Sequence, residues 1–251
     1  MSIALVAGGA VLGLLVGSFV NVVAHRVPRG ESVVRPRSRC PACGHQIRAR
    51  DNLPVLGWLL LRGRCRDCRA PVSPRYPLVE LLTAAVYALL AAALGPVPAL
   101  PAYLVLGAVG VALAVIDLDV RRLPDVLTLP TYVVGLVLLG AAALWQHDLG
   151  ALLRALAGMV ALFAFYLLLV LVYPAGMGLG DVKLAGVLGL YLGWLGYGVL
   201  VVGALAGVGL LLVGRAHRRT AIPFGPFMLL GALLAVVTGQ RLVDLYLAAL
   251  S

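Results

Sequence analysis

Long apolar runs follow one another along the chain, separated by short polar or glycine- and proline-rich gaps such as "GPVPALP" at 95–101. A helix needs about 20 apolar residues to cross the hydrocarbon core of a bilayer, and several runs reach that length. The pattern therefore predicts an all-α polytopic membrane protein with about eight transmembrane helices. The predicted spans are 3–24, 77–95, 99–117, 126–146, 151–173, 182–196, 197–214 and 222–239.

Composition supports this class of protein. Of the 251 residues, 62% are hydrophobic and 12% are charged, and the mean hydropathy is +1.04. A soluble domain of this size needs more charge on its surface. The N-terminal stretch "MSIALVAGGAVLGLL" lacks the basic start and the cleavage site of a secretory signal, so we expect the first helix to be retained.

Positive charge is concentrated in one segment. The formal net charge is +10, and twelve of the 20 Lys and Arg residues lie between Arg26 and Arg75. In a membrane protein such clustering is typical of a cytoplasmic loop held next to anionic lipid. We therefore expect membrane lipids, and no nucleic acid, among the partners.

Arginine placement also predicts the orientation of the chain. The loop at 25–76 is expected inside, and so, in alternation, are 118–125, 174–183 and 215–221. Both termini then face away from the cytoplasm. This interpretation divides the chain into a first transmembrane helix (1–24), a cytoplasmic Cys-rich loop (25–76) and a transmembrane domain (77–251).

All four cysteines lie in the long loop, as "CPACGH" and "CRDCRA". Four thiolates suit the tetrahedral coordination of structural zinc, although the 21 residues between the two pairs slightly exceed the usual spacing. His45 offers an alternative ligand. Two disulfides or four free thiols are the other interpretations, and a reducing cytoplasm disfavours disulfides. We predict a structural, zinc-ribbon-like four-cysteine site that folds the loop, with the ligands Cys40, Cys43, Cys65 and Cys68.

Three of the ten acidic residues crowd into "VIDLDVRRLPD". Asp125 follows a proline and is expected to be a helix N-cap, and Asp119 can form a solvated ion pair with Arg121 or Arg122. Asp117 closes the third span, where burial costs about 2.5–3.5 kcal/mol on insertion scales and the helix C-terminus disfavours negative charge. A functional role is the better explanation of Asp117.

A second candidate lies in "GMGLGDVKL" at 176–184. Asp181 could simply cap the sixth span, but a cap does not require the preceding Gly176, Gly178 and Gly180. Glycines allow another chain to approach closely, so we expect a substrate backbone against them. Lys183, the only lysine in the sequence, lies two residues further on.

Asp117 and Asp181 both belong to the predicted inner face and can meet at one depth. Two adjacent carboxylates share a proton, and such a pair can activate a water and protonate a scissile carbonyl. This is the chemistry of an aspartic peptidase. The alternatives are a proton-coupled transporter that uses the same acids as a relay, and a metal-binding membrane adaptor without catalysis.

The motifs resemble one known family in their joint occurrence and order, namely the bacterial type IV prepilin leader peptidases, which are GxGD-type aspartic membrane proteases. The motifs that carry this resemblance are "GSFVNVVAHRVP" (17–28), the double C-x2-C loop, "RYPLVELLT" (75–83), "IDLDVRRLPDVLTLP" (116–130), "GMGLGDVKL" and "IPFGPFM" (222–228). The resemblance implies catalysis by Asp117 and Asp181 at the cytoplasmic face of the bacterial inner membrane. It also implies removal of the basic leader from type IV prepilins or type II secretion pseudopilins.

Many members of this family also methylate the new N-terminus with S-adenosylmethionine, and the cysteine loop is a feature of the bifunctional members. The resemblance therefore implies a methyltransferase as well, with S-adenosylmethionine as its cofactor. Its binding residues are not indicated by the sequence. Glu80, at the start of the second span, is either a polar contact of the site or an interfacial partner of Arg75.

Overall fold

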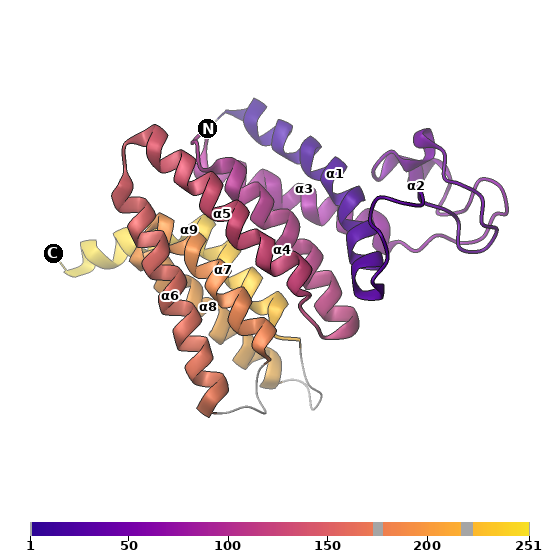
Figure 1. Cartoon of the computed structure of the whole chain (residues 1–251). Helices are drawn as coiled ribbons and strands as arrows, with labels where there is room; N and C mark the ends of the chain where they lie inside the picture. The colour runs from indigo at the N-terminus through magenta and orange to yellow at the C-terminus, as the bar shows by residue number, and fades with distance from the viewer. Residues whose placement is uncertain (1, 173–177, 217–222, 251) are drawn as a thin grey trace. The chain divides into compact units, whose positions relative to one another are not determined.

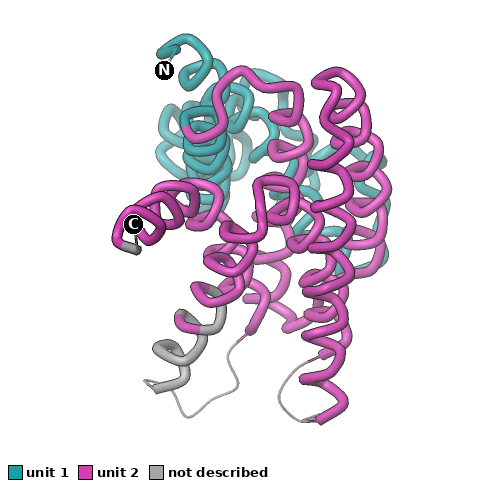
Figure 2. The backbone as a smooth tube through the Cα atoms, turned by 90° about the vertical axis from the view of Figure 1, so that its left-hand side faces the viewer, with its two compact units in different colours: residues 1–92 teal, residues 93–251 magenta. Residues whose placement is uncertain are grey.

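The computed structural model describes residues 2–172, 178–216 and 223–250. Residues 173–177 and 217–222, which include Gly176 and most of the last predicted inner loop, lie outside the described residues. The chain divides into two compact units, Met1–Ala92 and Ala93–Ser251 (Figure 2).

The predicted all-α membrane fold is confirmed, and each predicted span corresponds to a helix (Figure 1). These helices are α1 (Ile3–Arg26), α3 (Arg75–Leu94), α4 (Leu100–Val120), α5 (Asp125–Gln146), α6 (Leu149–Val172), α7 (Leu179–Leu195), α8 (Tyr197–Ala216) and α9 (Gly225–Leu250). Among the described residues, six helices are long and apolar enough to cross a membrane: α1, α3, α4, α5, α6 and α9. The chain is therefore a multi-pass membrane protein.

The division between α7 and α8 depends on one glycine. α7 ends at Leu195, α8 begins at Tyr197, and Gly196 between them has a φ of 129°. Residues with a Cβ rarely adopt this conformation. Glycine at this position allows two helices to follow each other with a single connecting residue.

The first unit contains α1, α3 and the loop between them, which has only the short helices η1 (Val27–Arg29), η2 (Ala49–Asn52) and α2 (Leu56–Leu60). α1 and α3 pack through a stripe of glycines four residues apart. A methyl group on Gly13 would lie 2.6 Å from Ala84 Cα, and one on Gly17 would lie 2.7 Å from Glu80 Cα. Small residues at this spacing allow membrane helices to approach closely.

In the second unit, α7 is the central helix, and nearly every residue from Val182 to Trp194 is buried. Its contact with α6 is made by glycines: a methyl group on Gly193 would lie 2.6 Å from the Arg154 carbonyl oxygen, and one on Gly158 of α6 would lie 3.0 Å from Gly193 Cα. Dispersion contacts and backbone proximity, rather than water exclusion, hold such helices together in lipid.

Two tyrosines also join α7 to its neighbours. The Tyr103 hydroxyl of α4 donates a hydrogen bond to the Tyr191 carbonyl at 2.7 Å, and the Tyr132 hydroxyl of α5 donates one to the Lys183 carbonyl at 2.6 Å. Both bonds have a backbone acceptor on α7. The position of α7, including its first turn, is therefore determined by α4, α5 and α6 together.

We expect Gly193→Ala to lower the stability of the second unit by about 1–3 kcal/mol, because the added methyl group overpacks the contact between α6 and α7. Thermal unfolding of the full-length protein in detergent measures this effect. Gly140→Ala in α5 is the control, because a methyl group there meets no atom within 4 Å. Equal unfolding temperatures for the two variants would contradict the glycine-mediated contact.

Candidate active site and metal centre

Asp117 lies in the last turn of α4 and is 5% exposed. Its Oδ2 atom accepts a hydrogen bond of 3.0 Å from the backbone N–H of Gly225, the first residue of α9. The start of a helix presents free N–H groups and partial positive charge. The N-terminus of α9 therefore offsets the unfavourable position of Asp117 at the end of its own helix.

Asp181 occupies the first turn of α7 and is partly buried. Its Oδ2 atom accepts a hydrogen bond of 3.0 Å from the backbone N–H of Gly178, the N-cap residue. The capping interaction that the sequence left open as an alternative is therefore present. It does not exclude chemistry, because a carboxylate has further lone pairs.

The second unit brings the two aspartates together. Their carboxylates are close enough to interact electrostatically. Leu123, in the turn between α4 and α5, lies next to Gly180, which precedes Asp181, and next to Gly225, which binds Asp117. A methyl group on Gly180 would lie 3.2 Å from Leu123 Cβ, and one on Gly225 would lie 3.2 Å from Leu123 Cδ2. Two acids from segments far apart in sequence thus share one end of the helix bundle.

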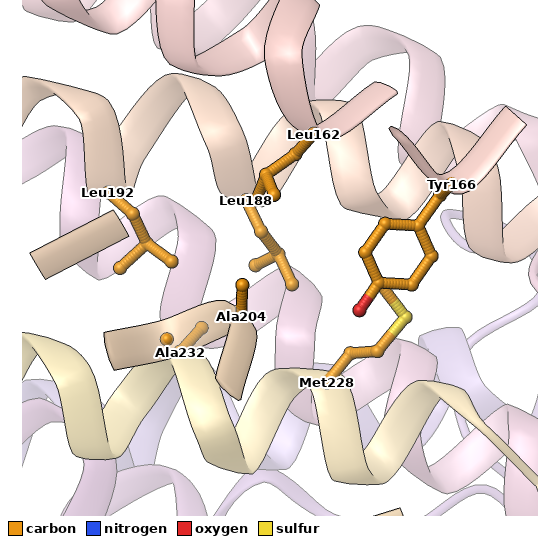
Figure 3. Close-up of a pocket in the computed structure, with 8 residues that line it drawn as sticks. Leu162, Tyr166, Leu188, Leu192, Ala204, Met228 and Ala232 are labelled. Carbon is orange, nitrogen blue, oxygen red and sulfur yellow. The ribbon is translucent and has the colours of Figure 1, made fainter. Parts of the chain in front are cut away.

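A small pocket of the second unit is shown in Figure 3, and one of its lining residues, Tyr166, interacts with Asp181. Tyr166 of α6 is 2% exposed, interacts electrostatically with Asp181 and packs edge-on against Phe224, with 6.1 Å between the ring centroids. Figure 3 shows its ring beside Met228. The pocket is lined by Leu162, Tyr166, Leu188, Leu192, Gly203, Ala204, Met228 and Ala232. These residues suit an apolar group rather than a charged one.

Lys183 does not bind Asp181 but forms a bidentate ion pair with Asp125, with Nζ–Oδ distances of 2.7 and 2.8 Å. The sequence-based assignment of Asp125 as an N-cap was wrong, because Pro124 is the N-cap and Asp125 is the first helical residue of α5. Its negative charge still suits the helix start. The pair joins the first turns of α5 and α7, beside Asp181.

In the first unit, the two cysteine pairs form matching turns. The Cys40 N–H donates to the His45 carbonyl at 2.9 Å, and the Cys65 N–H donates to the Ala70 carbonyl at 2.8 Å. The residue after the second cysteine of each pair has a positive φ, 72° at Gly44 and 61° at Arg69. The two segments therefore fold as copies of one knuckle.

These knuckles bring all four thiols together, as the spacing predicted. The sulfurs of Cys40, Cys43, Cys65 and Cys68 lie within 4.8 Å of one another, and no disulfide links them. A zinc ion with Zn–S bonds of about 2.3 Å requires sulfurs about 3.8 Å apart, and the distance from Cys40 Sγ to Cys68 Sγ is 3.8 Å. The cluster can hold a metal ion of this size.

The pKa values of the thiols differ within the cluster. Hydrogen bonds from the backbone N–H groups of Cys43 and Ala42 lower the pKa of the Cys40 thiol to about 7, and the thiolate is the form that binds metal. Burial and the neighbouring thiols instead raise the pKa of the Cys43 thiol to about 12. Arg66, inside the second knuckle, donates hydrogen bonds of 2.6–3.1 Å to Asp51 and holds the pKa of that carboxyl below its usual value. This pair fixes the knuckle to the segment before α2.

Glu80, 8% exposed in α3, has an unexpected partner. Its Oε2 atom accepts a hydrogen bond of 2.7 Å from the backbone N–H of Val55 in the loop, and its carboxylate also interacts with the hydroxyl of Ser18. Glu80 therefore fixes part of the cysteine-containing loop to a membrane helix of the same unit.

Fold and site together define a multi-pass membrane protein with two carboxylates that interact electrostatically and a four-thiol cluster. The profile described as "Type IV leader peptidase family" matches residues 104–239, and that described as "Bacterial Peptidase A24 N-terminal domain" matches residues 11–94. The chain belongs to the type IV leader peptidase family. The resemblance stated from the sequence motifs is thus confirmed.

Curated relatives agree with this family. One from Aeromonas hydrophila is 41% identical over 267 residues, which cover 93% of this chain and 91% of the relative. One from Stutzerimonas stutzeri is 38% identical, covering 94% and 92%, and one from Pseudomonas aeruginosa is 37% identical, covering 94% and 91%. Each is named "Prepilin leader peptidase/N-methyltransferase". No solved structure showed a significant match.

Sequence reasoning missed Gly225 as the hydrogen-bonding partner of Asp117. The stretch "IPFGPFM" did carry a signal, because a glycine–proline step is typical of a helix start. What it could not indicate is which side chain, 108 residues earlier, that helix start would bind.

We expect Gly225→Ala to reduce cleavage of a prepilin substrate by on the order of 10- to 100-fold, because small displacements of catalytic groups are costly. The new methyl group would lie 2.9 Å from Asp117 Oδ2, so the carboxylate must move away from the N–H that holds it. Initial cleavage rates, measured on protein of confirmed thermal stability, provide the readout. Unchanged rates would show that this hydrogen bond does not position Asp117.

Proposed function

We propose that this chain is a membrane aspartic endopeptidase that removes the basic leader of type IV prepilins or type II secretion pseudopilins. Membership of the leader peptidase family supports the activity, and the names of the curated relatives support the substrate class. The main supporting observation is that Asp117 and Asp181 interact electrostatically while each accepts a hydrogen bond from one backbone N–H. The comparisons give no support to the transporter alternative.

In this proposal Asp117 and Asp181 form the catalytic pair and share one proton. The ionised member removes a proton from water, and the neutral member protonates the oxygen of the scissile carbonyl as water attacks its carbon. Within the described part of the chain, each acid receives one backbone hydrogen bond. The two environments differ, because Asp117 is buried at the end of α4 whereas Asp181 is partly buried in the first turn of α7.

Gly178 is proposed to contact the substrate backbone. Its φ of −92° is open to any residue, and a methyl group there would come no closer than 3.6 Å to Asp181 Oδ2. The fold therefore does not require glycine at 178, and the residue is exposed. A need for close approach by another chain accounts for it. Gly180, packed on Leu123, and Lys183, paired with Asp125, are proposed to support the site structurally.

The four-thiol cluster is proposed to bind zinc as a structural ion. A loop this rich in arginine and proline has little apolar surface to bury, and a bound metal can supply the missing folding free energy. Zinc has no redox chemistry, and a closed shell of four thiolates leaves no open position for substrate. The ion would therefore hold the two knuckles together without taking part in cleavage.

A second activity, N-methylation of the new N-terminal residue, is proposed from the names of the relatives. S-adenosylmethionine would supply an electrophilic methyl group for the free amine. We assign no residue to this cofactor. Glu80 is proposed as a structural contact of the loop rather than part of a cofactor site, because its carboxylate binds Val55 and Ser18 of the same unit.

The proposed setting is the bacterial inner membrane, with the aspartates and the cysteine loop on the cytoplasmic side. The concentration of arginine in the loop supports this orientation. In functional terms we divide the chain into an anchoring helix (1–24), a metal-binding loop (25–76) and a transmembrane peptidase domain (77–251). Prepilin leaders and membrane lipids are the proposed partners, and nucleic acid is not.

We expect Asp117→Asn and Asp181→Asn each to lower the cleavage rate by at least about 1,000-fold, because either change removes one carboxyl of the pair. Mass spectrometry of a co-expressed prepilin follows loss of the leader. Asp119→Asn is the matched control, because Asp119 is an exposed acid only two residues from Asp117, and it should cleave within about threefold of the parent. Parental rates for Asp117→Asn would overturn the assignment.

Replacement of one thiol tests the metal site. We expect Cys40→Ser to lose most of its zinc and to make the 25–76 loop sensitive to protease, since structural zinc supplies about 10–16 kcal/mol in small zinc domains. Native mass spectrometry of the full-length protein counts the bound ion. His45→Ala, which leaves all four thiols in place, should retain one zinc. Absence of metal from the parent protein would refute a structural zinc.

A further inference from the structure

The arginine-rich loop contains one segment that its polar character does not explain. Residues 53–61, "LPVLGWLLL", are nine consecutive apolar residues between the two cysteine pairs. An apolar run of this length is too short to span a bilayer, and it is typical of a buried, re-entrant or interfacial segment.

Only part of this segment is used to pack the loop. Trp58 donates a hydrogen bond of 2.9 Å from Nε1 to the Val72 carbonyl, and Gly57 is buried against the Asp51 backbone. Four leucines on and around α2 are exposed instead. Their exposed fractions are 48% at Leu53, 58% at Leu56, 55% at Leu59 and 77% at Leu60.

The depth of α2 follows from its bond to α3. Glu80 is the sixth residue of α3 and binds the Val55 N–H, immediately before α2. At 1.5 Å per residue, Glu80 lies about 7.5 Å along the axis from the start of that helix. α3 itself is of a length to span the hydrocarbon core, about 30 Å for 20 residues. The bond therefore holds the start of α2 beside the first two turns of α3, a helix long and apolar enough to span the membrane.

The residues around α2 have the composition expected at a lipid interface. On α3, Leu78 and Leu81 are 62% and 49% exposed, as expected of side chains that face lipid. Arginines flank the apolar segment on both sides, at positions 48, 50, 62 and 64. Leucines directed into the acyl boundary and arginines at headgroup level are typical of interfacial segments in anionic membranes.

We propose that residues 53–61 form an interfacial lipid anchor, in which the exposed leucines of and around α2 insert into the anionic leaflet that surrounds the protein. Glu80 positions this anchor by holding the Val55 backbone, whose φ of 60° is unusual for a β-branched residue. The anchor would fix the height of the adjacent cysteine knuckles above the membrane. This proposal does not depend on the peptidase assignment.

Depth-dependent fluorescence quenching tests the anchor in full-length protein. An environment-sensitive fluorescent amino acid is introduced at position 60, and single copies of the protein are placed in nanodiscs that contain anionic phospholipid. The control places the same probe at position 34, because Val34 is 75% exposed and Leu60 is 77% exposed. Arg26 at the end of α1 binds the carbonyls of Ser32 and Pro36 on either side of Val34, which keeps the control beyond the apolar part of α1.

We expect brominated acyl chains to quench the probe at position 60 at least about twofold more than the probe at position 34, and aqueous iodide to show the reverse preference. Glu80→Gln should reduce this difference, because a neutral amide is a weaker acceptor for the Val55 N–H. Equal quenching at the two positions would overturn the proposal. The proposal would also be overturned if the probe at position 60 became shielded from iodide only after a peptide substrate was added, or only with two copies of the protein per nanodisc.

Discussion

Each candidate catalytic acid is held by the backbone N–H of a glycine at the start of a helix, Asp181 by Gly178 and Asp117 by Gly225. A backbone donor moves only when its helix moves, so the positions of the two carboxylates depend on how α7 and α9 are packed. Charge-assisted hydrogen bonds of this kind are also the strong ones. They reduce the cost of placing acids at membrane depth, where few other donors are available.

The position of Asp181 also depends on how α7 packs against its neighbours. Glycines bring α7 and α6 into backbone contact, and Tyr103 and Tyr132 bind its carbonyls from α4 and α5. The ion pair between Lys183 and Asp125 adds a link at the end where Asp181 lies. Constraints on three sides leave α7 little freedom to rotate, which is what the proposed pair of acids sharing one proton would require.

The sequence was most informative where the signal is local. Apolar runs predicted the helices because a bilayer imposes one length scale on all of them, and the repeated C-x2-C spacing predicted a four-thiol cluster. Contacts between residues far apart in the sequence could not be predicted. Three such contacts depend on tertiary packing: the start of α9 binds Asp117, Lys183 binds Asp125, and Glu80 binds the cysteine-containing loop. Residue types and spacing within a segment carry no record of these pairings.

The shortness of α7 has a geometric consequence. Its 17 residues extend about 26 Å, less than the roughly 30 Å of hydrocarbon. A lipid-facing helix of that length would force the bilayer to thin, but the neighbours of α7 separate it from the acyl chains. The shielded part of α7, from Val182 to Trp194, can therefore be shorter than the bilayer is thick, while Gly178 and Leu179 at its start stay exposed. An exposed start on an otherwise shielded short helix would let a hydrolytic water and a peptide bond reach the same depth while the surrounding membrane keeps its normal thickness.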